Sequence, residues 1–117
     1  WAHGGDGVPD SVIDTIEENR DRGLHTVAYL DIKAESEEML SGSRAASLLA
    51  THWRDDVLGV VVGRAGSPDP VVKADTLQNL SEGEFGAPPH LLVIPGELHP
   101  IERDALEAFA GAPDALL

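Results

Sequence analysis

Leu24-His25-Thr26-Val27-Ala28-Tyr29-Leu30-Asp31-Ile32 is the stretch that decides the fold class of this 117-residue chain. In an extended strand, side chains alternate between two faces, and the even-numbered residues from Leu24 to Ile32 form one largely apolar face. Val27 and Tyr29 make the opposite face apolar as well. A strand that is apolar on both sides is typical of a sheet covered by helices on both faces. We therefore expect a buried strand from Leu24 to Ile32.

The sequence on either side of this strand predicts helices with recognisable ends. Asp10 or Ser11 can cap a helix that runs to about Arg22, and Gly23 can end it. Ser41 can cap a second helix. The last helix is expected at 101–110, with Pro100 at its first position and Gly111 closing it.

Further apolar runs predict the remaining strands at 57–63 and 90–94, and a short extended piece at 71–74 that leads into a helical turn near 76–80. Pro70 places that extended piece at a sheet edge. The resulting order of elements predicts an α/β fold, a three-layer sandwich with a mixed central sheet flanked by helices. Ligands usually bind at the carboxyl ends of strands in such sheets, which directs attention to three loops: 31–34, 64–67 and 95–99.

The charge balance excludes several classes of partner. Asp plus Glu number 21 against 8 Lys plus Arg, a formal net charge of -13, which argues against nucleic acid and anionic lipid as partners. There is no cysteine, and no apolar stretch reaches the roughly 20 residues of a membrane span. We expect a cytoplasmic protein that does not bind a membrane. Acidic residues are scattered and Lys33 and Lys73 are the only lysines, a composition typical of salt-adapted organisms; a surface for cations or basic partners is the alternative.

Few single residues indicate chemistry on their own. The five histidines show no metal-ligand spacing such as His-x-x-x-His, so no metal site is predicted. His25 and His52 are expected to be structural. His90 follows Pro88-Pro89 at the mouth of a strand, where it can either present a ring nitrogen to a ligand or cap the strand. Asp31 and Lys33 end the first strand and can orient a polar ligand or simply be solvated.

Several stretches together carry a more specific signal. In chain order they are Ile16-Glu-Glu-Asn-Arg-Asp-Arg-Gly-Leu-His-Thr26, Leu30-Asp-Ile-Lys33, Arg64-Ala-Gly-Ser67, Phe85-Gly-Ala-Pro-Pro-His90 and Ile94-Pro-Gly-Glu-Leu-His99. From about Pro9 to Ala112 the chain resembles the C-terminal domain of the diphthine synthases, a family of the tetrapyrrole-methylase type. The resemblance implies residues 1–8 as an entry segment or linker and 9–117 as the C-terminal α/β domain of a two-domain S-adenosyl-L-methionine-dependent methyltransferase.

The resemblance also implies a reaction and its partners. Diphthine synthases methylate the amino group of an aminocarboxypropyl-modified histidine on translation elongation factor 2, and a homodimer is expected. Matching family positions one by one assigns cofactor contacts to Leu30, Ala65 and His90. The catalytic residue stays unassigned, with Asp31 the nearest candidate for the proton acceptor.

The family's N-terminal domain has no counterpart here, and the chain starts at Trp1, so we expect a fragment that is inactive alone. Two alternatives remain open at this point. One is a non-catalytic dimerisation or interaction domain, and the other is a related methyltransferase that acts on a small molecule.

Overall fold

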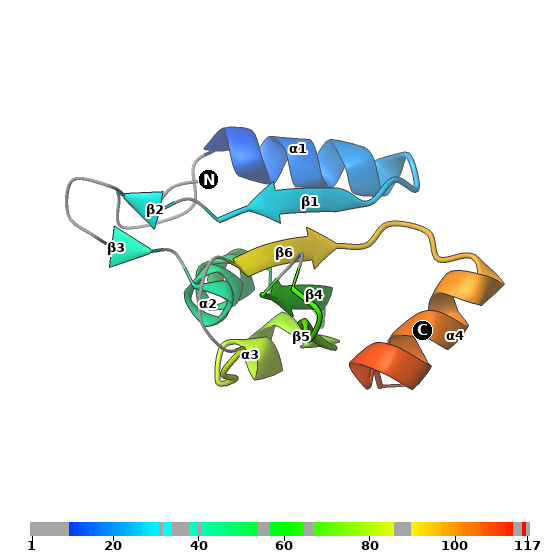
Figure 1. Ribbon diagram of the computed structural model, residues 1–117. Helices are drawn as coiled ribbons and strands as arrows, with labels where there is room; N and C mark the ends of the chain where they lie inside the picture. The colour runs from blue at the N-terminus through cyan, green and yellow to red at the C-terminus, as the bar shows by residue number, and fades with distance from the viewer. Residues whose placement is uncertain are drawn as a thin grey trace.

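The computed structural model describes residues 10–30, 32–33, 38–39, 41–53, 57–64, 67–85, 90–113 and 116. Figure 1 shows the arrangement of the elements. In chain order they are α1 (Asp10–Asp21), β1 (Thr26–Tyr29), β2 (Ile32–Lys33), β3 (Glu38–Met39), α2 (Gly42–His52), β4 (Leu58–Gly63), β5 (Val71–Thr76), α3 (Leu77–Leu80), β6 (His90–Ile94) and α4 (Pro100–Ala110).

The main sheet has four strands in the order β1-β6-β4-β5, and β2 and β3 form a separate ladder. One face of the main sheet packs against α1, α2 and α3, and the other packs against α4, which stands apart from the other helices in Figure 1. The α/β class and the layers are therefore confirmed. The expected mixed sheet is wrong for the described strands, because all three pairings in the main sheet are antiparallel. Strand β5 lies at an edge, as Pro70 predicts.

The strand predicted from Leu24 to Ile32 is shorter and more exposed than expected. Strand β1 covers only Thr26–Tyr29. The strand begins later in the sequence than predicted, because Gly23, at φ 73°, ends α1 with a Schellman motif that also uses the backbone N–H of Leu24. The expected helical cover is present on one face only: Val27 and Tyr29 are 48% and 68% exposed.

Three other predicted helix ends are confirmed, whereas Asp10 and Ser11, the predicted caps of α1, lie inside that helix. The Ser41 hydroxyl accepts a hydrogen bond from the backbone N–H of Arg44 and caps α2. Pro100 occupies the first turn of α4, and Gly111 ends that helix at φ 67°. The left-handed conformation is one that glycine adopts without steric cost, which explains both glycine ends.

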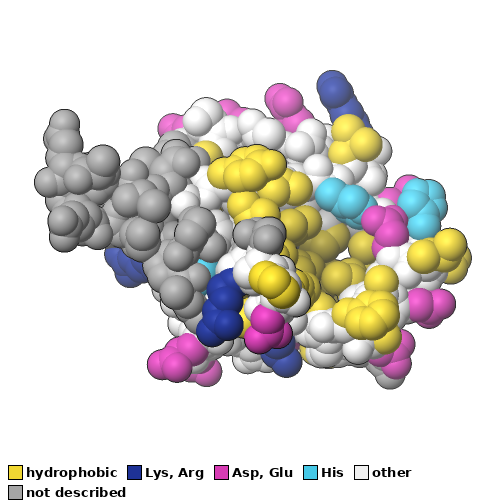
Figure 2. All heavy atoms as spheres, viewed as in Figure 1, with side chains coloured by type: hydrophobic (Ala, Val, Ile, Leu, Met, Phe, Trp, Pro, Cys, Tyr) yellow, Lys and Arg dark blue, Asp and Glu magenta, His cyan; other side chains and the backbone are white. Residues whose placement is uncertain are grey.

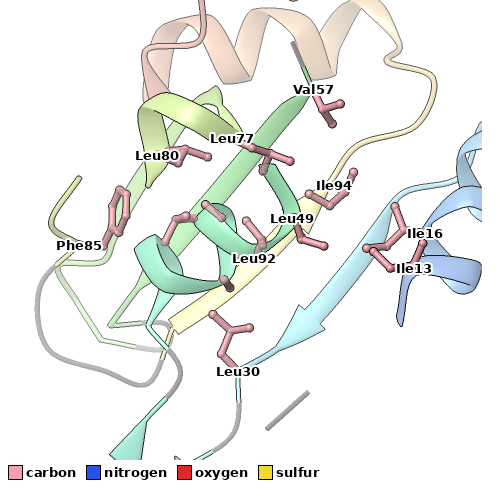
Figure 3. Close-up of a cluster of buried hydrophobic side chains, with 13 residues drawn as sticks. Ile13, Ile16, Leu30, Leu49, Val57, Leu77, Leu80, Phe85, Leu92 and Ile94 are labelled. Atoms are coloured by element: carbon pink, nitrogen blue, oxygen red, sulfur yellow. The ribbon is translucent and has the colours of Figure 1, made fainter. Parts of the chain in front are cut away.

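The main core lies between the sheet and helices α1 to α3. Figure 3 shows Ile13 and Ile16 of α1 at one side of this cluster, Phe85 at the other, and Leu49 and Leu92 between them. A smaller cluster lies under α4, where Ala110 packs with the buried side chains of Val60, Ala74 and Ala112. Adjacent residues of β4 thus serve opposite faces of the sheet.

Candidate functional site

Two of the three predicted cofactor contacts lie side by side at one end of the sheet. Leu30 directly follows β1 and His90 begins β6, and the backbone N–H of Leu30 donates to the His90 carbonyl oxygen at 3.3 Å. Both residues are only 4% exposed. The Leu30 side chain belongs to the main core.

The third predicted contact, Ala65, lies outside the described residues. The described strand before it ends beside His90, because Gly63 at the end of β4 pairs with His90. Arg64 follows with φ 53°, a left-handed conformation that costs a non-glycine residue of order 1 kcal/mol. Backbone outliers of this kind concentrate at ligand sites, so this one supports the sequence assignment of the 64–67 loop.

The ring of His90 is held by a second segment of the chain. The backbone N–H of Gly42, the first residue of α2, donates to Nδ1 of His90 at 2.9 Å. Phe85 meets the imidazole edge-on, with ring centroids 6.1 Å apart. Because Nδ1 accepts a hydrogen bond, the neutral ring carries its proton on Nε2.

Residue 42 must be a glycine for this contact to form. A Cβ at Gly42 would overlap Cγ1 of Val61, because α2 begins directly against β4. The close approach brings the first amide of α2 within reach of the buried His90 ring. The sequence did not predict a role for Gly42, because Gly42 and His90 are 48 residues apart and no common motif contains both.

A pocket of about 360 Å³ opens beside His90. Its lining combines hydroxyls, a carboxylate and aromatic rings: Ser41, Ser43, Gly83, Glu84, Phe85 and His90. Such a wall can stack on or pack against an apolar ring system and hydrogen-bond to hydroxyl groups. None of these residues except His90 was predicted as a site residue, although Ser41 was predicted to cap α2 and Phe85 begins one of the stretches that carry the resemblance.

Of the other candidates from the sequence, two cannot be described and one lies elsewhere in the fold. Asp31 lies outside the described residues, and the side chain of Lys33 in β2 is not among those described. The prediction that the 95–99 loop contributes to this site is wrong. Because β6 runs antiparallel to β1 and β4, its carboxyl end, where Ile94 pairs with Thr26, is at the opposite end of the sheet.

At that opposite end, His25 joins three segments, which supports the expected structural role. Its Nδ1 accepts a hydrogen bond from the Gly96 backbone N–H at 2.9 Å, and its Nε2 donates to Oε2 of Glu102 at 2.6 Å. The other carboxylate oxygen of Glu102 accepts from the His99 backbone N–H at 3.0 Å. The hydrogen bond from the His99 backbone and the one from His25 both lower the pKa of Glu102.

The part of the chain that the structure describes holds no group of three or more His, Asp or Glu side chains placed to bind a metal ion. No helix within the same residues is long and apolar enough to cross a membrane.

Comparison with known proteins shows which proteins this chain is similar to. No family model matches the chain. The diphthine synthase of Halobacterium salinarum is 61% identical over 122 residues, which covers 99% of this chain and 47% of the relative. That of Halorubrum lacusprofundi is 59% identical over 126 residues, covering 100% of this chain and 47% of the relative. The chain corresponds to the C-terminal half of diphthine synthases.

A solved structure agrees with the sequence comparison. A crystal structure of a diphthine synthase matches the fold with a TM-score of 0.82 and 34% identity, covering 92% of this chain and 43% of that structure. The chain thus spans about half the length of the diphthine synthases it matches. The predicted resemblance is confirmed, and the halophilic origin of the relatives accords with the scattered acidic residues.

Proposed function

We propose that this chain is the C-terminal domain, residues 9–117, of an S-adenosyl-L-methionine-dependent methyltransferase of the diphthine synthase type. The identity to diphthine synthases along nearly the whole chain carries the proposal. The substrate is the aminocarboxypropyl-modified histidine of translation elongation factor 2, whose amino group accepts the methyl groups. The enzyme acts in the cytoplasm as a homodimer, and its activity requires the half of the protein that this chain does not span.

The cofactor is held at the sheet end where β1 and β4 finish, by Leu30, Ala65 and His90. Two features of the described residues fit an adenosyl group. The backbone hydrogen bond between Leu30 and His90 holds two of the proposed contacts together at one end of the sheet. The pocket beside it supplies an aromatic wall and the hydroxyls of Ser41 and Ser43.

When bound, S-adenosyl-L-methionine supplies a methyl group that is already activated for transfer. The protein's task is therefore to bind, align and exclude water from the reactants. Leu30 and the 64–67 loop contribute close backbone contact, and His90 contributes a rigid ring whose donor is Nε2. The proton lost by the acceptor amine goes to a carboxylate or to water, and Asp31, which follows Leu30 in the sequence, is the candidate carboxylate.

The proposal is tested in the complete enzyme, with this domain joined to the upstream half, at high salt. We expect methyl incorporation into elongation factor 2 that carries the aminocarboxypropyl histidine. Absence of transfer to this substrate would overturn the proposed function. Transfer to a small-molecule acceptor instead would favour the alternative methyltransferase reading.

A matched pair of variants tests the location of the cofactor. Ser43→Arg fills the pocket beside His90, whereas Thr51→Arg adds the same side chain to an exposed position of the same helix. We expect Ser43→Arg to weaken cofactor binding by at least about tenfold in calorimetry, since it displaces the ligand from its contacts. Equal cofactor affinities of the two variants would show that the cofactor does not bind in this pocket.

A further inference from the structure

The short segment 83–85, which follows α3, is held in place by two close contacts. The Phe85 ring is only 4% exposed and lies at the edge of the main core in Figure 3. A Cβ at Gly83 would overlap this ring, and a Cβ at Gly63 of β4 would overlap the carbonyl oxygen of Phe85. The backbone on both sides of Glu84 is therefore packed tightly, and Glu84 extends from a fixed position.

The Glu84 side chain faces the pocket beside His90. It is exposed, unlike the buried Phe85 ring, and it lines the pocket of about 360 Å³ described above. Glu84 is the only carboxylate among the described residues of this lining. It makes no hydrogen bond and no ion pair with any residue that the structure describes. The fold thus presents one unpaired carboxylate to the pocket.

Most acidic side chains of this chain are explained by solvation alone. There are 21 of them, and on the face shown in Figure 2 they lie at separate places and form no single patch. Glu82 is an example two residues from Glu84, since it is exposed and does not line the pocket. Glu84 differs from Glu82 in its position in the pocket, so the two carboxylates form a matched pair for experiment.

The serine hydroxyls of the same pocket are partly satisfied within the protein. The Ser41 hydroxyl accepts a hydrogen bond from the Arg44 backbone N–H at 3.1 Å and lies 3.2 Å from the Ser43 hydroxyl. Both oxygens of Glu84, by contrast, are available to a ligand. An ionised carboxylate only accepts hydrogen bonds, so the ligand group that meets Glu84 must be a donor.

The choice of ligand group rests on the proposed function, which places the adenosyl part of the cofactor in this pocket. The ribose of an adenosyl group carries two adjacent hydroxyls, which can each donate to one carboxylate oxygen. Acidic side chains recognise ribose hydroxyls in this way in dinucleotide-binding sites of an unrelated fold. We propose that Glu84 is a cofactor-binding residue whose carboxylate accepts hydrogen bonds from the ribose hydroxyls.

The magnitude of salt screening favours this direct contact over a long-range attraction to the positively charged sulfur of the cofactor. At 1 M salt the Debye length is about 3 Å, so a carboxylate in an open pocket acts mainly on the groups that it touches. A hydrogen bond to a charged acceptor is short-ranged and remains effective under these conditions. The relatives of this chain come from halophiles, which makes high salt the relevant condition.

Calorimetry of the complete enzyme at high salt tests the proposal, with S-adenosylhomocysteine and its 2′-deoxy analogue as probes. S-adenosylhomocysteine has the same ribose without the charged sulfur, so it reports on the hydroxyls alone. The wild type should bind the 2′-deoxy analogue about tenfold more weakly, because one hydrogen bond to a charged group is lost. Glu84→Ala should bind S-adenosylhomocysteine at least about tenfold more weakly than the wild type and bind both probes equally. Glu82→Ala should match the wild type with both probes.

Circular dichroism of the variants should equal that of the wild type, since Glu84 and Glu82 are exposed. The proposal is overturned if the wild type does not distinguish the two probes, or if Glu84→Ala distinguishes them as well as the wild type does. A Glu84→Ala enzyme with unchanged affinity and slower methyl transfer would also overturn it, by placing the carboxylate at the acceptor. Methyl transfer by the wild type tests the proposed function separately: an active enzyme that ignores the 2′-hydroxyl keeps that function and loses the role of Glu84.

Discussion

The contact between α2 and β4 beneath His90 makes a quantitative prediction about Gly42. Substituting alanine places a Cβ inside the contact distance of Val61 Cγ1, and the new methyl also lies 3.4 Å from Nδ1 of His90. Overpacking a well-filled core costs about 1–3 kcal/mol, partly offset by up to about 1 kcal/mol from the better helix propensity of alanine. We therefore expect Gly42→Ala to lower the free energy of unfolding by about 1–2 kcal/mol.

A double-mutant cycle isolates this clash from other effects. Val61 is fully buried, and Val61→Ala alone should cost about 2 kcal/mol by leaving a cavity. In that background the Cβ of Gly42→Ala occupies the vacated space, so the second substitution should cost nothing. The predicted coupling between the two sites is then about 1–2 kcal/mol in favour of the double variant.

Urea unfolding at constant high salt measures the four free energies of the cycle. Additive effects, within about 0.5 kcal/mol, would refute the argument that Gly42 is needed for close approach of α2 to β4. A Gly42→Ala variant more stable than the wild type would refute it as well. Cofactor affinity of the complete enzyme, measured on the same variants, then shows whether the position of α2 matters for the site.

Two further predictions concern single side chains. His90→Ala leaves the buried Gly42 N–H without its acceptor, which should lower the free energy of unfolding by about 1–3 kcal/mol in urea. As a control, His52→Ala at an exposed position should change that free energy by no more than about 0.5 kcal/mol, and equal effects of the two substitutions would contradict the role of the His90 ring. The lowered pKa of Glu102 means that its charged form contributes stability above the ordinary value of 4.5, which is lost as the pH falls through the lowered pKa of the folded state. Glu102→Gln should therefore flatten the decline of the thermal midpoint on acidification below about pH 4.5, and an unchanged decline would count against the His99 and His25 hydrogen bonds.

Local signals predicted the ends of the helices well, because each end depends on residues close in sequence. Gly23 and Gly111 adopt left-handed conformations, Ser41 caps α2, and Pro100 opens α4. These residues act through their own backbone geometry or a hydrogen bond within one turn, so the sequence specifies them without knowledge of the fold.

The features that the sequence could not specify depend on residues far apart. Apolar runs identify strands but carry no information on direction, so the 95–99 loop was assigned to the wrong end of the sheet. Likewise, apolar residues at Val27 and Tyr29 indicate burial but not what buries them, and no helix of the described chain covers both. The partner of the His90 ring, Gly42, becomes visible only when α2 is placed against β4.

The strand order has a consequence for how the chain folds. Strand β6, the last to be synthesised, lies between β1 and β4 and joins the earliest strand to the rest of the main sheet. A nascent chain that ends before His90 therefore holds β1 without its neighbour, with the hydrogen-bonding edge of the strand exposed. Such long-range pairing raises the contact order and slows folding. The sheet is expected to close in one late, cooperative step, and the domain is most prone to aggregation just before β6 emerges from the ribosome.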